Sequence, residues 1–193
     1  MNKTFTSLGW VRCVAVIALF GIGSIVLTAS TAAQDPLKDF QARILAYVAL
    51  NKKANGTVPS VPKNVTDPTI IAQHEQQLAG AIRALRPNAK QGEIFTPAAQ
   101  KTIAGIIKTR LDSNARTTIL GEGNPKSSES STPINLAVNA TYPPSASVST
   151  MPPSLLMALP TLPPEVEFRF VGHSLILRDV KANMIVDVMP NAI

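Results

Sequence analysis

The distribution of proline is the feature of this sequence that most limits its fold. Nine of the 16 prolines lie within residues 124–164. Proline has no backbone N–H and restricts φ, so a stretch this rich in proline forms neither a long helix nor an inner strand. Apolar residues before it recur at helical spacing, and those after it alternate as in a strand. We therefore expect an α+β fold, with the helices first and the strands last.

The first 33 residues have the pattern of a secretory signal peptide. Lys3 and Arg12 precede an apolar run over residues 13–27, and small residues follow up to Ala33. As a helix this run would span about 22 Å, less than the roughly 30 Å of bilayer hydrocarbon. We expect export to the periplasm or beyond, with cleavage after Ala33 or after Ala32. The alternative is that the leader stays uncleaved as an anchor. The protein would then contact the membrane through the leader only.

Removal of this leader changes the composition. The only cysteine, Cys13, and the only tryptophan, Trp10, both belong to it, so no disulfide is expected in the remainder. That remainder has 16 basic and 12 acidic side chains, a formal charge of +4. Nucleic-acid binding usually needs a concentrated basic face, so this mild charge argues against a nucleic-acid partner.

Residues 34–121 are predicted to be helical. Helix starts are marked by a polar cap residue followed by proline. The caps are Asp35, then Thr66 or Asp67, and then Thr96. Apolar residues follow at intervals of three and four; they are Leu37, Phe40, Ile44 and Val48, then Ile71, Leu78, Ile82 and Leu85, then Ile103, Ile106, Ile107 and Leu111. We expect a bundle of about three amphipathic helices, with a further short helix near residues 114–120.

Residues 122–164 are interpreted as a Pro- and Ser-rich linker. Within it, residues 154–159 are too apolar for a solvated spacer, so we expect a short helical turn that docks on the helices.

Residues 165–193 are predicted to form a β unit. Val166, Phe168 and Phe170 alternate with polar residues, Gly172 suits the first central position of a type II′ turn, and residues 184–189 make a third strand. Because a hairpin alone is marginal in water, its apolar face should pack on the helices.

Two stretches of the sequence resemble known exported proteins. Residues 168–172, Phe-Arg-Phe-Val-Gly, with residues 175–180 and 182–183 are similar to the end of a group of uncharacterised exported bacterial proteins, and residues 84–95 are similar to the middle of that group. This resemblance implies a bacterial, exported source and no particular activity. Residues 95–100 approximate the Leu-Thr-x-x-Gln helix start of periplasmic stress adaptors, although Thr-Pro is also an ordinary helix cap.

Candidate catalytic residues are few. Glu165 and Glu167 would lie on one face of a strand, roughly 6.5–7 Å apart, which suits a two-carboxylate hydrolase, but a solvated strand face explains the pair more simply. His173 lies next to Ser174, with Asp179 nearby. Adjacent strand residues point to opposite faces, so these three do not make a convincing triad.

His74 is the candidate metal ligand. It precedes Glu75, but no second histidine follows at the spacing of a zinc-binding His-Glu-x-x-His helix. Its position in the apolar stripe favours a partly buried structural imidazole. The sequence has no glycine-rich phosphate loop and no paired-cysteine site, so no cofactor is expected.

Several basic residues could make a positive surface for lipid headgroups or cell-wall polymer. They are Arg83, Arg86, Lys90, Lys101, Lys108 and Arg110. The polar backs of amphipathic helices explain the same residues, and we favour that interpretation.

The sequence favours a non-catalytic binding or assembly module of the bacterial envelope, whose partner is an unidentified protein or envelope component. One alternative is an envelope hydrolase that uses Glu165, Glu167 or His173. The other is a periplasmic stress adaptor or chaperone that presents an apolar helical surface.

Overall fold

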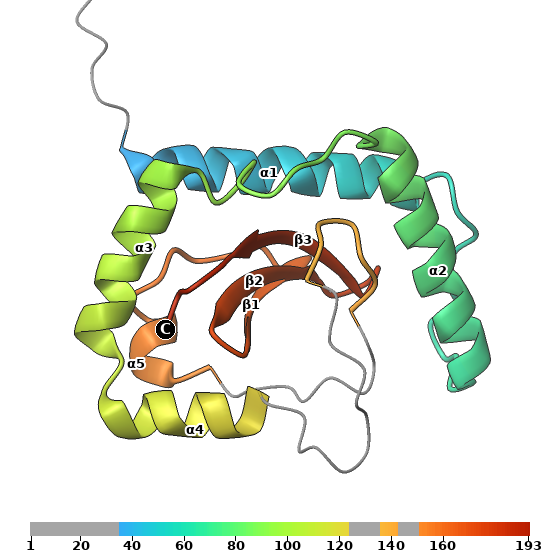
Figure 1. The fold of residues 1–193 in the computed structure, drawn as a ribbon. Helices are drawn as coiled ribbons and strands as arrows, with labels where there is room; N and C mark the ends of the chain where they lie inside the picture. Colours follow the sequence, from blue (N-terminus) through green and yellow to red (C-terminus); the bar gives the residue numbers. More distant parts are fainter. Residues whose placement is uncertain (1–34, 124–135, 143–150) are drawn as a thin grey trace, which may run out of the picture. The chain divides into compact units, whose positions relative to one another are not determined.

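The computed structural model describes residues 35–123, 136–142 and 151–193 (Figure 1). These residues belong to one unit, residues 33–193. Helices come first and a three-stranded antiparallel sheet packs on them, so the predicted α+β class is confirmed. The predicted leader at residues 1–33 and two parts of the predicted linker, residues 124–135 and 143–150, lie outside the described residues.

The helices begin where the cap sequences predict. Their bounds are Pro36–Asn55 for α1, Pro68–Leu85 for α2, Pro97–Arg110 for α3, Ser113–Gly123 for α4 and Pro153–Leu156 for α5. Asp35, Asp67 and Thr96 each accept a hydrogen bond from a backbone N–H of the first turn. Asp67 is therefore the cap of α2. Within the described ranges, no helix combines the length and apolar content that crossing a bilayer requires.

The helix α1 is the element that contacts both α2 and α3. The predicted stripes of α1 and α3 are confirmed, since Phe40, Ile44 and Ile103 are among their fully buried residues. The stripe of α2 is wrong at both ends: Ile71 is 41% exposed and Leu85 is 39% exposed. Among the described residues, the buried part of α2 is its centre, at Leu78, Ala79 and Ile82, and both ends of the stripe are exposed.

The sheet has the order β1-β2-β3. The strands span Val166–Val171 for β1, Ser174–Asp179 for β2 and Met184–Met189 for β3, as the alternating pattern predicts. Gly172 has a φ of +54°, which a type II′ turn needs at its first central position and which glycine adopts without strain. Both hairpins are antiparallel, with Phe168 opposite Leu177 and Leu177 opposite Asp187.

A bulge in β3 changes which face its side chains occupy. The register shifts between Leu177 and Arg178, so Val186 has no partner of its own opposite β2. An inserted residue reverses the alternation that follows it. As a result Asp187 lies opposite Leu177, whose side chain faces the helices, and Asp187 faces the helices as well.

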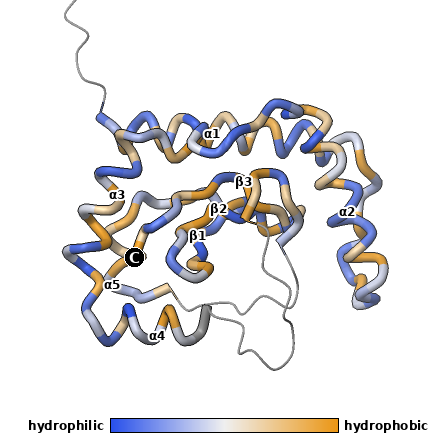
Figure 2. Tube along the Cα trace, in the orientation of Figure 1, coloured by the Kyte–Doolittle hydropathy of each residue, from blue (hydrophilic) through white to orange (hydrophobic). Residues whose placement is uncertain are grey.

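The core lies between the sheet and the helices. Three phenylalanine rings meet there, Phe40 of α1, Phe95 of the loop before α3, and Phe168 of β1, with centroid separations of 5.5 to 6.4 Å. Each is at most 5% exposed, and burying one such ring contributes roughly 1.5–3 kcal/mol. The predicted packing of the apolar strand face on the helices is confirmed. Figure 2 shows how hydrophobic and hydrophilic residues alternate along the helices that surround this core.

The opposite face of the sheet is covered by residues 136–142. The backbone N–H of Tyr142 donates to the carbonyl of Asn183 at 2.8 Å, and that of Ile185 donates to the carbonyl of Ala140 at 2.9 Å. Tyr142 thereby joins a second apolar cluster with Ile176, Ile185 and Val188. The sheet consequently has apolar cover on both faces.

The short helix α5 docks on the helices, as predicted for residues 154–159. Leu155 and Leu159 are buried in the main core, and α5 contacts α3. Leu156 and Met157, between them, are 56% and 88% exposed. One turn of helix can bury only one side, so the apolar segment is divided between core and surface.

A buried carboxylate fixes the loop between α2 and α3 to the sheet. Asp187 is completely buried and accepts four backbone hydrogen bonds at 2.8 Å, from Gly92, Ile94, Phe95 and Val188. These bonds compensate the cost of removing the carboxylate from water, and they satisfy N–H groups that the loop would otherwise bury unpaired.

We expect Asp187→Ala to lower the free energy of unfolding by about 3–5 kcal/mol, because it leaves several buried N–H groups without an acceptor. Urea unfolding followed by circular dichroism measures this loss. The matched control is Asp112→Ala, which removes an exposed carboxylate that accepts one N–H, from Ala115, and should cost about 1 kcal/mol. Equal losses for the two variants would contradict the expectation that Asp187 stabilises the fold more than an exposed helix cap does.

Candidate functional site

The structure separates His173 from Glu165 and Glu167. Glu165 pairs with Lys52 of α1 at 3.6 Å, and Glu167 pairs with two arginines. His173 lies beyond the other end of β1, a strand about 20 Å long, and its Nδ1 is 2.9 Å from the carbonyl oxygen of Ile193. Each of these side chains thus has its own structural partner.

The expectation of a solvated strand face is wrong for Glu165 and Glu167. Their side chains are only 15% and 24% exposed. Glu165 is covered because α1 passes near the start of β1, where Lys52 reaches it. Glu167 is covered because it shares the outward face of the sheet with two long arginine side chains.

Glu167 is the centre of this charged cluster. Its Oε1 accepts a hydrogen bond from Arg178 at 2.7 Å, and its Oε2 accepts one from Arg169 at 2.6 Å. Burial alone would raise the pKa of Glu167, but the hydrogen bonds and charges of the two arginines outweigh it and hold the pKa below its usual range. Arg178 also donates to Asn183 Oδ1 and lies 5.0 Å from the centre of the Tyr142 ring.

Two buried polar atoms beside this cluster, the hydroxyl of Tyr142 and Nε of Arg169, find no hydrogen-bond partner among the described residues. Burial raises the pKa of Tyr142, and the charges of Arg178 and Arg169 partly oppose the shift. Two guanidinium groups against one carboxylate leave a surplus positive charge here. The cluster therefore favours anions.

A second buried carboxylate, Asp179, ends β2. It accepts hydrogen bonds from the Tyr47 hydroxyl at 2.7 Å and from the Asn51 side chain, and from the backbone N–H groups of Lys181 and Ala182. Burial, followed by the Asp179 charge, raises the pKa of Tyr47, so the hydroxyl stays protonated as a donor. Asp179 therefore joins the β2–β3 turn to α1, and it lies apart from His173.

The predicted basic surface needs correction at Arg83 and Arg86. Arg83 donates to the carbonyl of Asn139 and to the Thr141 hydroxyl. Arg86, only 9% exposed, donates to the carbonyl of Val186 and pairs with Glu93 at 3.1 Å. Arg83 therefore joins α2 to residues 139–141, which lie beside β3, and Arg86 joins the end of α2 to β3 itself. Both arginines lie on the side of α2 that faces these segments. Four predicted residues are exposed and belong to α3 or the loop before it; they are Lys90, Lys101, Lys108 and Arg110.

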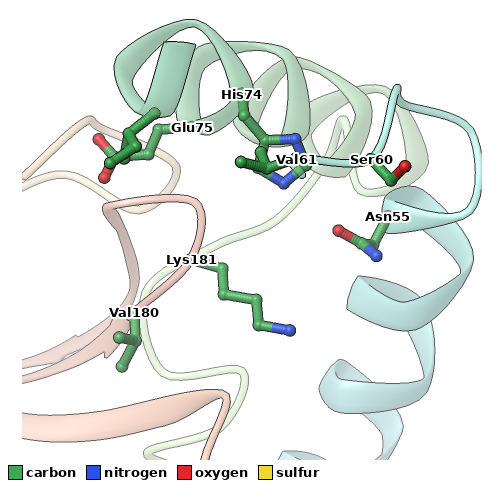
Figure 3. Close-up of a pocket in the computed structure, with 8 residues that line it drawn as sticks. Asn55, Ser60, Val61, His74, Glu75, Val180 and Lys181 are labelled. Atoms are coloured by element: carbon green, nitrogen blue, oxygen red, sulfur yellow. The ribbon is translucent and has the colours of Figure 1, made fainter. Parts of the chain in front are cut away.

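His74 lines an open pocket of about 430 Å³ between α1, α2 and the β2–β3 turn. Figure 3 shows its ring near Val61 and Ser60, with Lys181 and Asn55 across the opening. Nδ1 of His74 lies 3.0 Å from the carbonyl oxygen of Pro59, so Nδ1 carries the hydrogen and Nε2 is the acceptor in the neutral ring. In the described part of the chain, no three His, Cys, Asp or Glu side chains come close enough to hold a metal ion.

A second pocket, which we call the edge groove, runs beside β1 and has a volume of about 480 Å³. Residues 151–164, which include α5, form one wall with Met151, Leu156 and Leu162, and β1 contributes Phe168 and Arg169. The groove thus combines apolar walls with one cation of the charged cluster. Sequence reasoning identified the apolar segment but not this groove, because the groove forms only when residues 151–164 fold back beside β1.

We expect Glu167→Gln to lower the free energy of unfolding by about 1–2 kcal/mol at neutral pH, because Arg169 and Arg178 lose their common counter-charge. The folded-state pKa of Glu167 is below the unfolded value of about 4.3, so the stabilisation is complete above that pH and is lost as the pH falls through the folded-state pKa. Urea unfolding from about pH 7 to about pH 2 should show the wild-type advantage shrinking below about pH 4. A constant advantage over this range contradicts the assignment.

Comparisons of this chain with protein-family models, with curated proteins and with solved structures found no match.

Proposed function

We propose that this chain is an exported bacterial envelope protein that acts as a non-catalytic binding or assembly module. The leader pattern of residues 1–33 supports export, and the resemblance of residues 84–95 and 168–172 to exported bacterial proteins supports the bacterial source.

The exposed apolar surface beside the edge groove is the observation that carries this proposal. Leu156, the last residue of α5, and the adjacent Met157 are both more than half exposed, and the buried Leu155 holds α5 on the core. Large apolar side chains that a rigid element holds in water favour a partner that covers them. Leu162, which also lines the groove, extends the apolar surface.

The engagement of the acidic and histidine side chains also supports binding over catalysis. Asp179 and Asp187 anchor backbone, Glu167 neutralises arginines, and His173 contacts a carbonyl. A general acid or base must reach a substrate proton, and these groups are directed at the protein itself.

Photo-crosslinking in the organism that encodes the chain tests the proposal. A photoreactive amino acid at position 157 should give one discrete adduct with an envelope component, identified by mass spectrometry, while the same amino acid in place of Ile70, 40% exposed on α2, should not. The purified component should then bind the wild type about tenfold more tightly than it binds the Leu156→Ser variant. It should bind the Ile70→Ser variant with the same affinity as the wild type. No adduct at position 157, or the same adducts at both positions, contradicts the proposal.

The same experiment addresses the hydrolase alternative. Glu165→Gln combined with His173→Gln should leave the adduct at position 157 and the affinity for the purified component unchanged, because neither side chain belongs to the exposed apolar surface. Loss of a hydrolytic activity on envelope polymers in this double variant would instead support catalysis.

A further inference from the structure

The pocket that His74 lines has exposed apolar side chains on two of its walls. Ile71 of α2 and Val180 of the β2–β3 turn are each 41% exposed, and both line the pocket together with Val61. These residues come from segments that are far apart in the sequence, so the fold has brought solvent-facing apolar side chains to one opening. Exposed apolar side chains at a concave site favour a ligand that covers them.

The same pocket has two opposite charges on its walls. Figure 3 shows Glu75, on α2, and Lys181, on the β2–β3 turn, on different sides of the opening. Among residues 35–123, 136–142 and 151–193, neither the Glu75 carboxylate nor the Lys181 ammonium group forms an ion pair. Because the two groups do not pair with each other, each can pair with a ligand group of opposite charge.

The hydrogen-bonding groups of the pocket are divided in the same way. Nδ1 of His74 donates to the carbonyl of Pro59, so Nε2 is an acceptor on the same helix as Glu75. Asn55, the last residue of α1, lies across the opening with Lys181 and supplies an amide N–H donor (Figure 3). Acceptors thus line the α2 side, and donors line the side that faces it.

Internal hydrogen bonds hold these walls in place. The contact between His74 and Pro59 fixes the connector before α2 to that helix. The backbone N–H of Lys181 donates to Asp179 at 2.9 Å, and Asp179 accepts from the Tyr47 hydroxyl of α1. A preformed site lowers the entropic cost of binding, so mainly the exposed side chain of Lys181 has to become ordered around a ligand.

From this arrangement we infer that the pocket binds a small zwitterion with an apolar side chain, which is the chemistry of a free amino acid or a dipeptide. The ammonium group of the ligand donates to Glu75 and to Nε2 of His74. Its carboxylate accepts from Lys181 and Asn55, and its side chain packs on the exposed apolar residues. The pocket volume of about 430 Å³ suits one small molecule.

This site is separate from the edge groove. The residues that line the two pockets are entirely different, so the inference goes beyond the proposed function and does not rest on it.

Nuclear magnetic resonance titration of the isotope-labelled, purified protein at neutral pH tests the inference. The probes are leucine, the dipeptide leucylleucine, isocaproate, which is leucine without its ammonium group, and isoamylamine, which is leucine without its carboxylate. Leucine should bind saturably and about tenfold more tightly than isocaproate or isoamylamine, since a charge-assisted hydrogen bond contributes that factor. The amide signals of Val61 and Lys181 should shift, while that of Met157 should not. Tighter binding of leucine than of leucylleucine assigns a free amino acid, and the reverse assigns a peptide.

Charge variants give a second readout, in which each variant should affect a different analogue. Lys181→Met should weaken isocaproate about tenfold without weakening isoamylamine, and Glu75→Gln should do the opposite, because each variant removes the partner of one ligand charge. Both variants should weaken leucine. Lys38→Met, which removes an exposed lysine at the other end of α1, should bind every probe as the wild type does.

Three results overturn the inference. They are the absence of saturable binding of both leucine and leucylleucine, equal binding of leucine and its two analogues by the wild type, and equal effects of the two charge variants on both analogues. None of them alters the adduct expected at position 157, so the proposed function fails or stands on its own experiment.

Discussion

The buried carboxylate of Asp187 is the interaction on which the rest of the structure depends. A charge without water must be compensated by donors, and the loop between α2 and α3 supplies three of its four N–H groups. The same loop places Phe95 against Phe40 and Phe168, so one ionic anchor positions the aromatic centre of the core. The bulge at Val186 makes this possible because it turns Asp187 toward the helices.

Charged residues in this protein mostly join elements to one another. Asp179 ties the β2–β3 turn to α1, Arg86 ties α2 to β3, and Glu167 holds two arginines on the outward face of the sheet. The apolar surface around Leu156 is exposed, and two arginines against one carboxylate leave a surplus positive charge beside it. Both lie at the edge groove, and they support the binding function that we propose.

Local sequence patterns predicted the elements well. Cap-proline pairs located the starts of α1, α2 and α3, and alternation located all three strands. They failed where burial depends on neighbours distant in sequence: Ile71 and Leu85 are exposed, and the Arg86 side chain is only 9% exposed. Asp187 carried no local signal, because a lone aspartate in an apolar strand resembles a solvent-facing residue until the bulge reverses its direction.

The amino-acid sequence by itself determined the order of helices and strands, their caps and turns, and the apolar faces that had to meet, because these follow from backbone geometry and from periodicity along a few residues. Only the tertiary structure decided which polar groups became buried anchors and where the edge groove lies. Residues 151–164 fold back beside β1, and residues 136–142 cover β3. Such pairings join segments that no local pattern relates, so their contacts exist only once the chain has folded.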